Sequence, residues 1–256
     1  MFTLKNLSKR TTFIIASVVI LALLLYCFLT PASFRLQASI IGFVGSVVAT
    51  ILVLWFAKRL KSFFISLIMP FFLLLALFFI SYFFQSLSLS FNVLFSVVAT
   101  IIYYFTLLSI NVFLVAEDRQ NGIPLLRPAG TYAFLIVQFA LFLLVALLYK
   151  IPVPILGATP MAFFIVYFLG LSYFWSQGEI ALGRGLAITV AILSSQFFYA
   201  LSFFPMEDLF RSLIVNAGFY VLVNTLYSLE KNTFRTKQIV EYTTIFAGII
   251  LFISLV

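Results

Sequence analysis

The 256-residue chain contains no histidine and a single cysteine, Cys27. Without histidine, the common zinc sites and the histidine-based catalytic triads and dyads are excluded. A single cysteine excludes an internal disulfide, and we interpret Cys27 as a buried thiol that plays no chemical role. No metal ion or other cofactor is predicted.

Charged residues are also scarce, at 9% of the chain against about 25% in an average soluble domain. Hydrophobic residues make up 64%, and 34 residues are phenylalanine. A soluble protein of this size still needs a polar surface, which 15 basic and 7 acidic residues cannot supply. The composition therefore predicts an integral membrane protein. It excludes a soluble enzyme, a nucleic-acid-binding protein and a disulfide-rich secreted domain.

Nine apolar segments have about the length that crosses roughly 30 Å of hydrocarbon. Their residues do not alternate between polar and apolar as barrel strands do, so we predict helices. The expected fold class is an all-α polytopic transmembrane bundle, a single membrane domain over residues 1–256 with no soluble domain. Eight spans remain if the last segment does not cross fully. The segments are Thr12–Thr30, Ala38–Phe56, Phe63–Phe83, Phe91–Ala116, Thr131–Tyr149, Met161–Trp175, Leu186–Phe204, Ser212–Ser228 and Ile239–Val256.

The basic residues predict the orientation, because cytoplasmic loops carry the excess of Lys and Arg. Twelve of the 15 fall on one side of the nine-span model, which places the N-terminus in the cytoplasm and a basic face against anionic headgroups. The twelve are Lys5, Lys9, Arg10, Lys58, Arg59, Lys61, Arg119, Arg127, Arg184, Lys231, Arg235 and Lys237. The two aspartates, Asp118 and Asp208, fall on opposite sides, which excludes paired intramembrane aspartyl chemistry.

The densest polar feature is the predicted cytoplasmic loop after the fourth span. Its acids, Glu117 and Asp118, have the ligand type for Mg²⁺, and its bases, Arg119 and Arg127, have the type that holds phosphate. This pattern suits an enzyme or carrier that handles a lipid phosphate. The structural alternative is a turn at Asn121-Gly122 with the charges among the headgroups, which we favour.

Two further patterns fail as enzyme motifs. The loop from Gly178 to Gly185, which holds the candidate headgroup residues Glu179 and Arg184, has the glycine spacing of a phosphate-binding loop but follows a membrane helix instead of a strand. Nine helices resemble the intramembrane prenyltransferases, but their paired aspartate-rich motifs are missing, since Asn111 is followed only by Glu117 and Asp118. We expect Glu179 and Arg184 to contact headgroups at most.

Amides, and no ionisable residues, occupy the centres of the predicted spans. This pattern disfavours a proton-coupled or cation transporter, which usually keeps charged groups at membrane depth. Asn111, Asn216 and Asn224 are candidates for a polar path through the bundle. Asn216 and Asn224 are eight residues apart and therefore lie near one helix face. The alternative, which we favour, is hydrogen bonding to neighbouring helices.

Small residues recur at every fourth position of the second span, at Ala38, Gly42, Ser46 and Thr50. Such a stripe lets helix backbones approach closely. It predicts either a contact inside the bundle or a dimer interface, and we favour the internal contact because many helices compete for that face. The loop 150–160, which carries three prolines, is predicted to be extended.

The stretch from Asn111-Val112-Phe113 through Ile123-Pro124-Leu125-Leu126-Arg127-Pro128-Ala129 resembles a segment of uncharacterised multi-pass membrane proteins of candidate-phyla bacteria. The resemblance covers under a tenth of the chain. It implies location in a bacterial inner membrane and implies no activity.

We therefore expect a non-catalytic membrane protein that acts as a scaffold or partner subunit, bound to another membrane protein or to copies of itself. A lipid-phosphate-handling enzyme or carrier at the cytoplasmic face is the alternative. A facilitator of a neutral solute is the third hypothesis.

Overall fold

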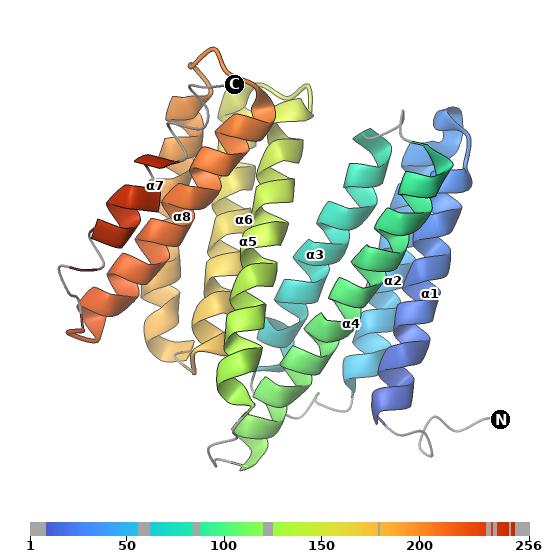
Figure 1. Cartoon of the computed structure of the whole chain (residues 1–256), viewed down its shortest axis with the longest axis horizontal. Coiled ribbons are helices and arrows are strands. Elements are labelled where there is room, and N and C mark those ends of the chain that lie inside the picture. The colour runs from blue at the N-terminus through green and yellow to red at the C-terminus, as the bar shows by residue number, and fades with distance from the viewer. Residues whose placement is uncertain are drawn as a thin grey trace. The chain divides into compact units, whose positions relative to one another are not determined.

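The fold is known from a computed structural model that describes residues 9–55, 62–83, 88–119, 125–178, 180–233, 237, 240–245 and 247–248. These residues form long α-helices joined by short turns, with one 3₁₀ turn and no strand (Figure 1). The elements are α1 (Lys9–Leu29), η2 (Ala32–Phe34), α2 (Arg35–Leu54), α3 (Phe63–Phe83), α4 (Leu89–Arg119), α5 (Leu126–Lys150), α6 (Ile155–Ser176), α7 (Ile180–Leu201) and α8 (Asp208–Glu230).

All eight α-helices are long and apolar enough to cross a membrane. Each overlaps one of the first eight predicted spans over most of its length, so the all-α polytopic fold is confirmed. The ninth predicted span lies mostly outside the described residues, although residues 240–245 and 247–248 are helical.

The helix ends differ from the predicted loops at two places. α4 continues through Glu117 to Arg119, and α5 begins at Leu126, so the polar segment between them is shorter than expected. α6 begins at Ile155 with Pro154 before it, and Pro160 lies inside this helix. The prediction of an extended loop to Pro160 was therefore wrong. The predicted spans were limited to the most apolar residues, whereas both helices continue past the ends of those spans.

Close packing divides the chain into two compact units, Met1–Ile136 and Val137–Val256, with the boundary inside α5. In the first unit, α1 packs against α2, α3 and α4. In the second, α7 packs against both α6 and α8. The expectation of a single membrane domain stays a prediction.

The small-residue stripe of α2 is buried inside the first unit, as predicted. Ala38, Gly42, Ser46 and Thr50 are all buried. A Cβ added at Gly42 would lie 2.5 Å from Cε1 of Phe78 and 2.9 Å from Sγ of Cys27. The Cys27 thiol is buried and donates to the Ala38 carbonyl at 3.2 Å. The stripe thus brings α2 against its neighbours, and Cys27 fills the contact.

Glycines also set the close approach of helices in the second unit. A Cβ added at Gly183 of α7 would lie 2.5 Å from Cβ of Phe174 on α6. At Gly218 of α8 it would lie 3.1 Å from the Phe197 ring on α7. Both distances are shorter than an ordinary carbon–carbon contact of about 3.5–4.0 Å, so a larger side chain at either position would need its neighbour to move.

Hydroxyl side chains are largely satisfied within their own helices. In each case the hydroxyl donates to a carbonyl three or four residues earlier, as Ser17 does to Phe13 at 2.9 Å. This bond needs no partner helix, so these residues fit an apolar environment. The residues that bond this way include Ser17, Thr50, Ser66, Ser96, Thr100, Thr106, Thr159, Ser195 and Thr244.

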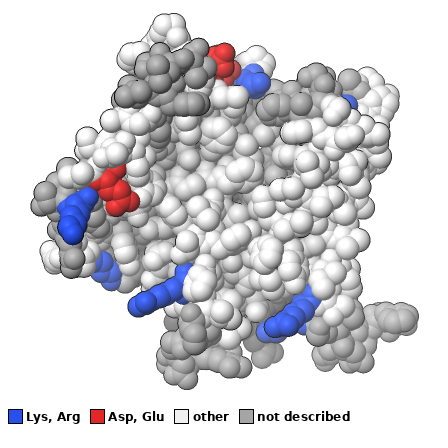
Figure 2. Space-filling view, in the orientation of Figure 1, with Lys and Arg blue, Asp and Glu red and all other residues white. Residues whose placement is uncertain are grey.

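The outward surface is apolar, as lipid requires. Exposed side chains follow one face of α2, with Ile41 at 60% and Leu52 at 62% exposure. Uncharged side chains cover most of the face drawn in Figure 2. Without lipid or a partner around it, such a surface would be exposed to water along the helices.

Candidate functional site

Glu117, the first predicted lipid-phosphate residue, has a structural partner. It lies in the last turn of α4, where the Ser62 hydroxyl donates a hydrogen bond to its Oε2. The Ser62 carbonyl in turn accepts the Ser66 N–H at 2.8 Å as α3 begins. The carboxylate is therefore held at the N-terminus of α3, where the helix dipole favours negative charge, and it joins α3 to α4.

The other predicted headgroup residues have fewer described contacts. Arg127 and Arg184 are exposed near the starts of α5 and α7. Glu179 lies outside the described residues, and the structure does not describe the side chains of Asp118 and Arg119. The grouping of these charges into one lipid-phosphate site stays a prediction.

The three candidate path residues lie in two different helices, α4 and α8. Asn224 donates to the Tyr220 carbonyl of its own helix at 2.8 Å. The Oδ1 atoms of Asn111 and Asn216 are buried and have no hydrogen-bond partner among the described residues. One of the three amides is thus satisfied locally, and a path past the other two stays a prediction.

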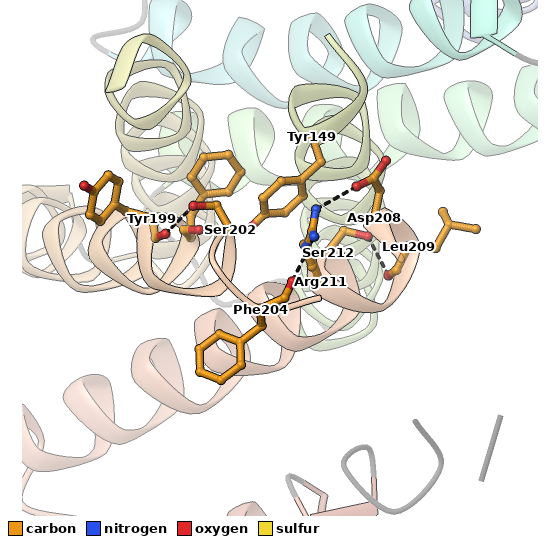
Figure 3. Close-up of polar contacts among 9 residues, drawn as sticks. Tyr149, Tyr199, Ser202, Phe204, Asp208, Leu209, Arg211 and Ser212 are labelled. Atoms are coloured by element: carbon orange, nitrogen blue, oxygen red, sulfur yellow. Dashed lines mark hydrogen bonds and ion pairs between the residues drawn. The ribbon is translucent and has the colours of Figure 1, made fainter. Parts of the chain in front are cut away.

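A polar cluster joins the ends of α5, α7 and α8 (Figure 3). Arg211 forms an ion pair with Asp208 at 3.0 Å and donates to the Phe204 carbonyl at 2.9 Å. Its guanidinium carbon lies 5.5 Å from the centre of the Tyr149 ring, which stacks on Phe198 at 4.4 Å. Arg211 therefore closes the turn between α7 and α8 and holds it against α5.

At its other end, α8 stops in a tight reversal of the chain. Asn232 has a left-handed backbone with φ of 52°. The Asn232 N–H donates to the Leu229 carbonyl at 3.1 Å, and the Thr233 N–H donates to the Ser228 carbonyl at 2.9 Å. This pair of bonds is the Schellman pattern that ends many helices. Helical residues 240–245 then lie beside α8 (Figure 1).

This return places a carboxylate halfway along α8. The Tyr220 hydroxyl donates to Oε1 of Glu241 at 3.1 Å. With a rise of 1.5 Å per residue, Tyr220 lies about 18 Å from Asp208 and about 15 Å from Glu230, the charged ends of the helix. Glu241 is exposed on the surface. Glu241, predicted near the start of a separate span, thus lies beside the middle of α8, and the expectation that no ionisable group lies at membrane depth stays a prediction.

The hydrogen bond between Tyr220 and Glu241 lies next to a pair of packed tyrosine rings. The Tyr242 ring meets the Tyr220 ring edge-on, with centres 5.9 Å apart and planes at 85°. Tyr242 and Tyr173 of α6 are buried, at 8% and 6% exposure. Further along α8, the Lys231 ammonium lies 6.0 Å from the centre of the Tyr227 ring. We call Glu241, Tyr220 and Tyr242 the carboxylate–tyrosine site.

Sequence reasoning missed this site because it placed Glu241 near the start of a separate span. One signal was present: Tyr220, Asn224 and Tyr227 are spaced by four and three residues, so they form a polar stripe on one face of α8. Such a stripe predicts that a polar neighbour packs there. It does not identify Glu241 as that neighbour.

No cluster of three or more metal-binding side chains occurs in the part of the chain that the structure describes. Comparison with protein-family models, curated proteins and solved structures finds no match. The class of this protein is therefore inferred from its fold and not from relatives. Eight apolar helices define a multi-pass α-helical membrane protein.

Proposed function

We propose that the protein is a non-catalytic subunit of a bacterial inner-membrane complex, which binds another membrane protein through the side of its second unit. The exposed carboxylate of Glu241, beside the middle of α8, is the observation that carries this proposal. A charged group at that depth costs about 2.5–3.5 kcal/mol on insertion scales. Residues of this kind usually face a protein or a water-filled cavity and mark function.

The structural use of other polar residues supports a role in assembly. Glu117 joins α3 to α4, and Arg211 closes the turn between α7 and α8. Both side chains were candidates for a binding or catalytic role, and both form contacts that hold helices together. Arg127 and Arg184, exposed at helix starts that attract anions, are proposed to contact anionic headgroups on the cytoplasmic side.

Photocrosslinking in native membranes tests this function. Val240 adjoins Glu241 and is 62% exposed, and Ile41 of α2 is 60% exposed on the apolar surface. Benzoylphenylalanine at position 240 should give a discrete protein adduct, whereas at position 41 it should give lipid adducts. Lipid adducts alone at both positions, with a lone monomer in mild detergent, would contradict a partner subunit.

A further inference from the structure

The strongest unexplained feature of the molecule is the exposed Glu241 side chain beside the middle of α8. Tyr220 supplies one hydrogen bond to Oε1, whereas a carboxylate has about four acceptor positions. The side chain is exposed, although the Tyr220 and Tyr242 rings pack against each other beside it. A donor approaching from outside the second unit would therefore find acceptor positions available.

The described basic residues do not neutralise this carboxylate. Arg211 pairs with Asp208, at the opposite end of α8 from Glu230. Lys237 lies one turn before Glu241 and is exposed, yet the two do not form an ion pair. Lys231 lies over the Tyr227 ring at the end of α8. The Glu241 side chain thus lies exposed beside the middle of α8, with no ion pair to a described basic residue.

Resting on the proposed function, we propose that the carboxylate–tyrosine site binds a transmembrane helix of a partner protein that carries a Lys or Arg at its middle. The basic group would complete the acceptor positions of Glu241, and the Tyr220 and Tyr242 rings add faces that attract cations. A helix is the expected carrier because it satisfies its own backbone in hydrocarbon.

Two other occupants fit less well. The amines of lipid headgroups lie at the membrane surface, about 15 Å from the middle of the hydrocarbon. In a second copy of this chain, the basic residues of helices α1 to α8 lie at or near helix ends. They are Lys9, Arg10, Arg35, Arg119, Arg127, Lys150, Arg184 and Arg211. Lys231 follows the end of α8, and Lys237, four residues before Glu241, is the one described base that self-association could use. Charge complementarity therefore favours a different protein.

A synthetic probe tests the proposal without knowledge of the natural partner. The probe is a leucine-rich transmembrane peptide with one central Lys, compared with the same peptide carrying Leu there, in phosphatidylcholine vesicles. The full-length protein carries a donor dye on Leu229→Cys, an exposed position, in a Cys27→Ser background. Energy transfer is followed as lipid dilutes the acceptor-labelled peptide.

We expect the Lys peptide to bind about tenfold more tightly than the Leu peptide, within the range of polar contacts between membrane helices. Glu241→Gln should remove this preference, whereas Glu241→Asp and the matched control Lys237→Gln should keep it. Unchanged helicity and gel-filtration behaviour show that each variant is folded. Tyr220→Phe, which keeps the charge, should weaken the preference without removing it.

Equal binding of the two peptides, or a preference that survives Glu241→Gln, would overturn the proposal. Energy transfer between two copies of the protein that disappears in Glu241→Gln would overturn it in favour of self-association. A discrete adduct at position 240 that persists in Glu241→Gln would support the partner-subunit function. It would contradict the proposal that a Lys or Arg of the partner binds Glu241.

Discussion

Gly183 offers the sharpest test of the packing in the second unit. In Gly183→Ala, the new Cβ would lie 2.5 Å from Cβ of Phe174, about 1 Å inside the usual carbon–carbon separation. The first carbon of a side chain cannot rotate away, so α6 and α7 would have to separate. Overpacking of this kind costs about 1–3 kcal/mol.

Gly185 is the matched control on the same helix. A Cβ added there meets no atom within 4 Å, so Gly185→Ala should gain only helix propensity, about 1 kcal/mol. Gly183→Ala gains the same propensity and adds the clash. We therefore expect Gly183→Ala to be about 1–3 kcal/mol less stable than Gly185→Ala, with wild type between them or close to the less stable variant.

The assay is unfolding in one mild detergent, followed by Trp175 fluorescence. Trp175 is buried beside Phe174, and Trp55→Phe leaves it as the single reporter, because the chain has two tryptophans. Phe174→Leu should not rescue Gly183→Ala, because leucine keeps the Cβ. Equal stability of the two alanine variants, or rescue by Phe174→Leu, would refute a backbone-level contact.

Three further predictions concern other parts of the chain. Gly42→Leu should lower stability by about 1–3 kcal/mol when unfolding is followed by Trp55 of the first unit in a Trp175→Phe background, and an unchanged midpoint would show that the α2 stripe does not pack as described. Arg211→Ala should cost about 1–3 kcal/mol by leaving polar partners unsatisfied and speed proteolysis between α7 and α8; an unchanged cleavage rate would contradict the role of Arg211 in closing this turn. For topology, an impermeant maleimide on intact cells should label Ser88→Cys and spare Gln120→Cys, each in Cys27→Ser; the reverse pattern would invert the orientation.

Hydropathy predicted a helix well where the apolar segment and the helix begin and end at the same residues. The third span was predicted at Phe63–Phe83, and α3 has these bounds. It failed where a helix continues into polar residues, as α4 does through Glu117, and where Pro160 was taken for a boundary. Proline inside a helix removes one hydrogen bond, and α6 accommodates it.

The candidate site was beyond sequence reasoning for a different reason. Glu241 follows Tyr220 by 21 residues, and the reversal after α8 brings the two together. Neither residue is unusual within its own segment. The buried α2 stripe, by contrast, was predicted correctly because its four residues share one helix face and identify that face without knowledge of the neighbour.

The hydroxyl bonds within single helices bear on how the chain enters the membrane. A helix such as α4, in which Ser96, Thr100 and Thr106 bond to their own backbone, can leave the translocon alone because its hydroxyls need no later partner. Glu241 differs, since its bond to Tyr220 forms only when α8 is already beside it. The segment after α8 is therefore expected to insert together with α8 as a hairpin.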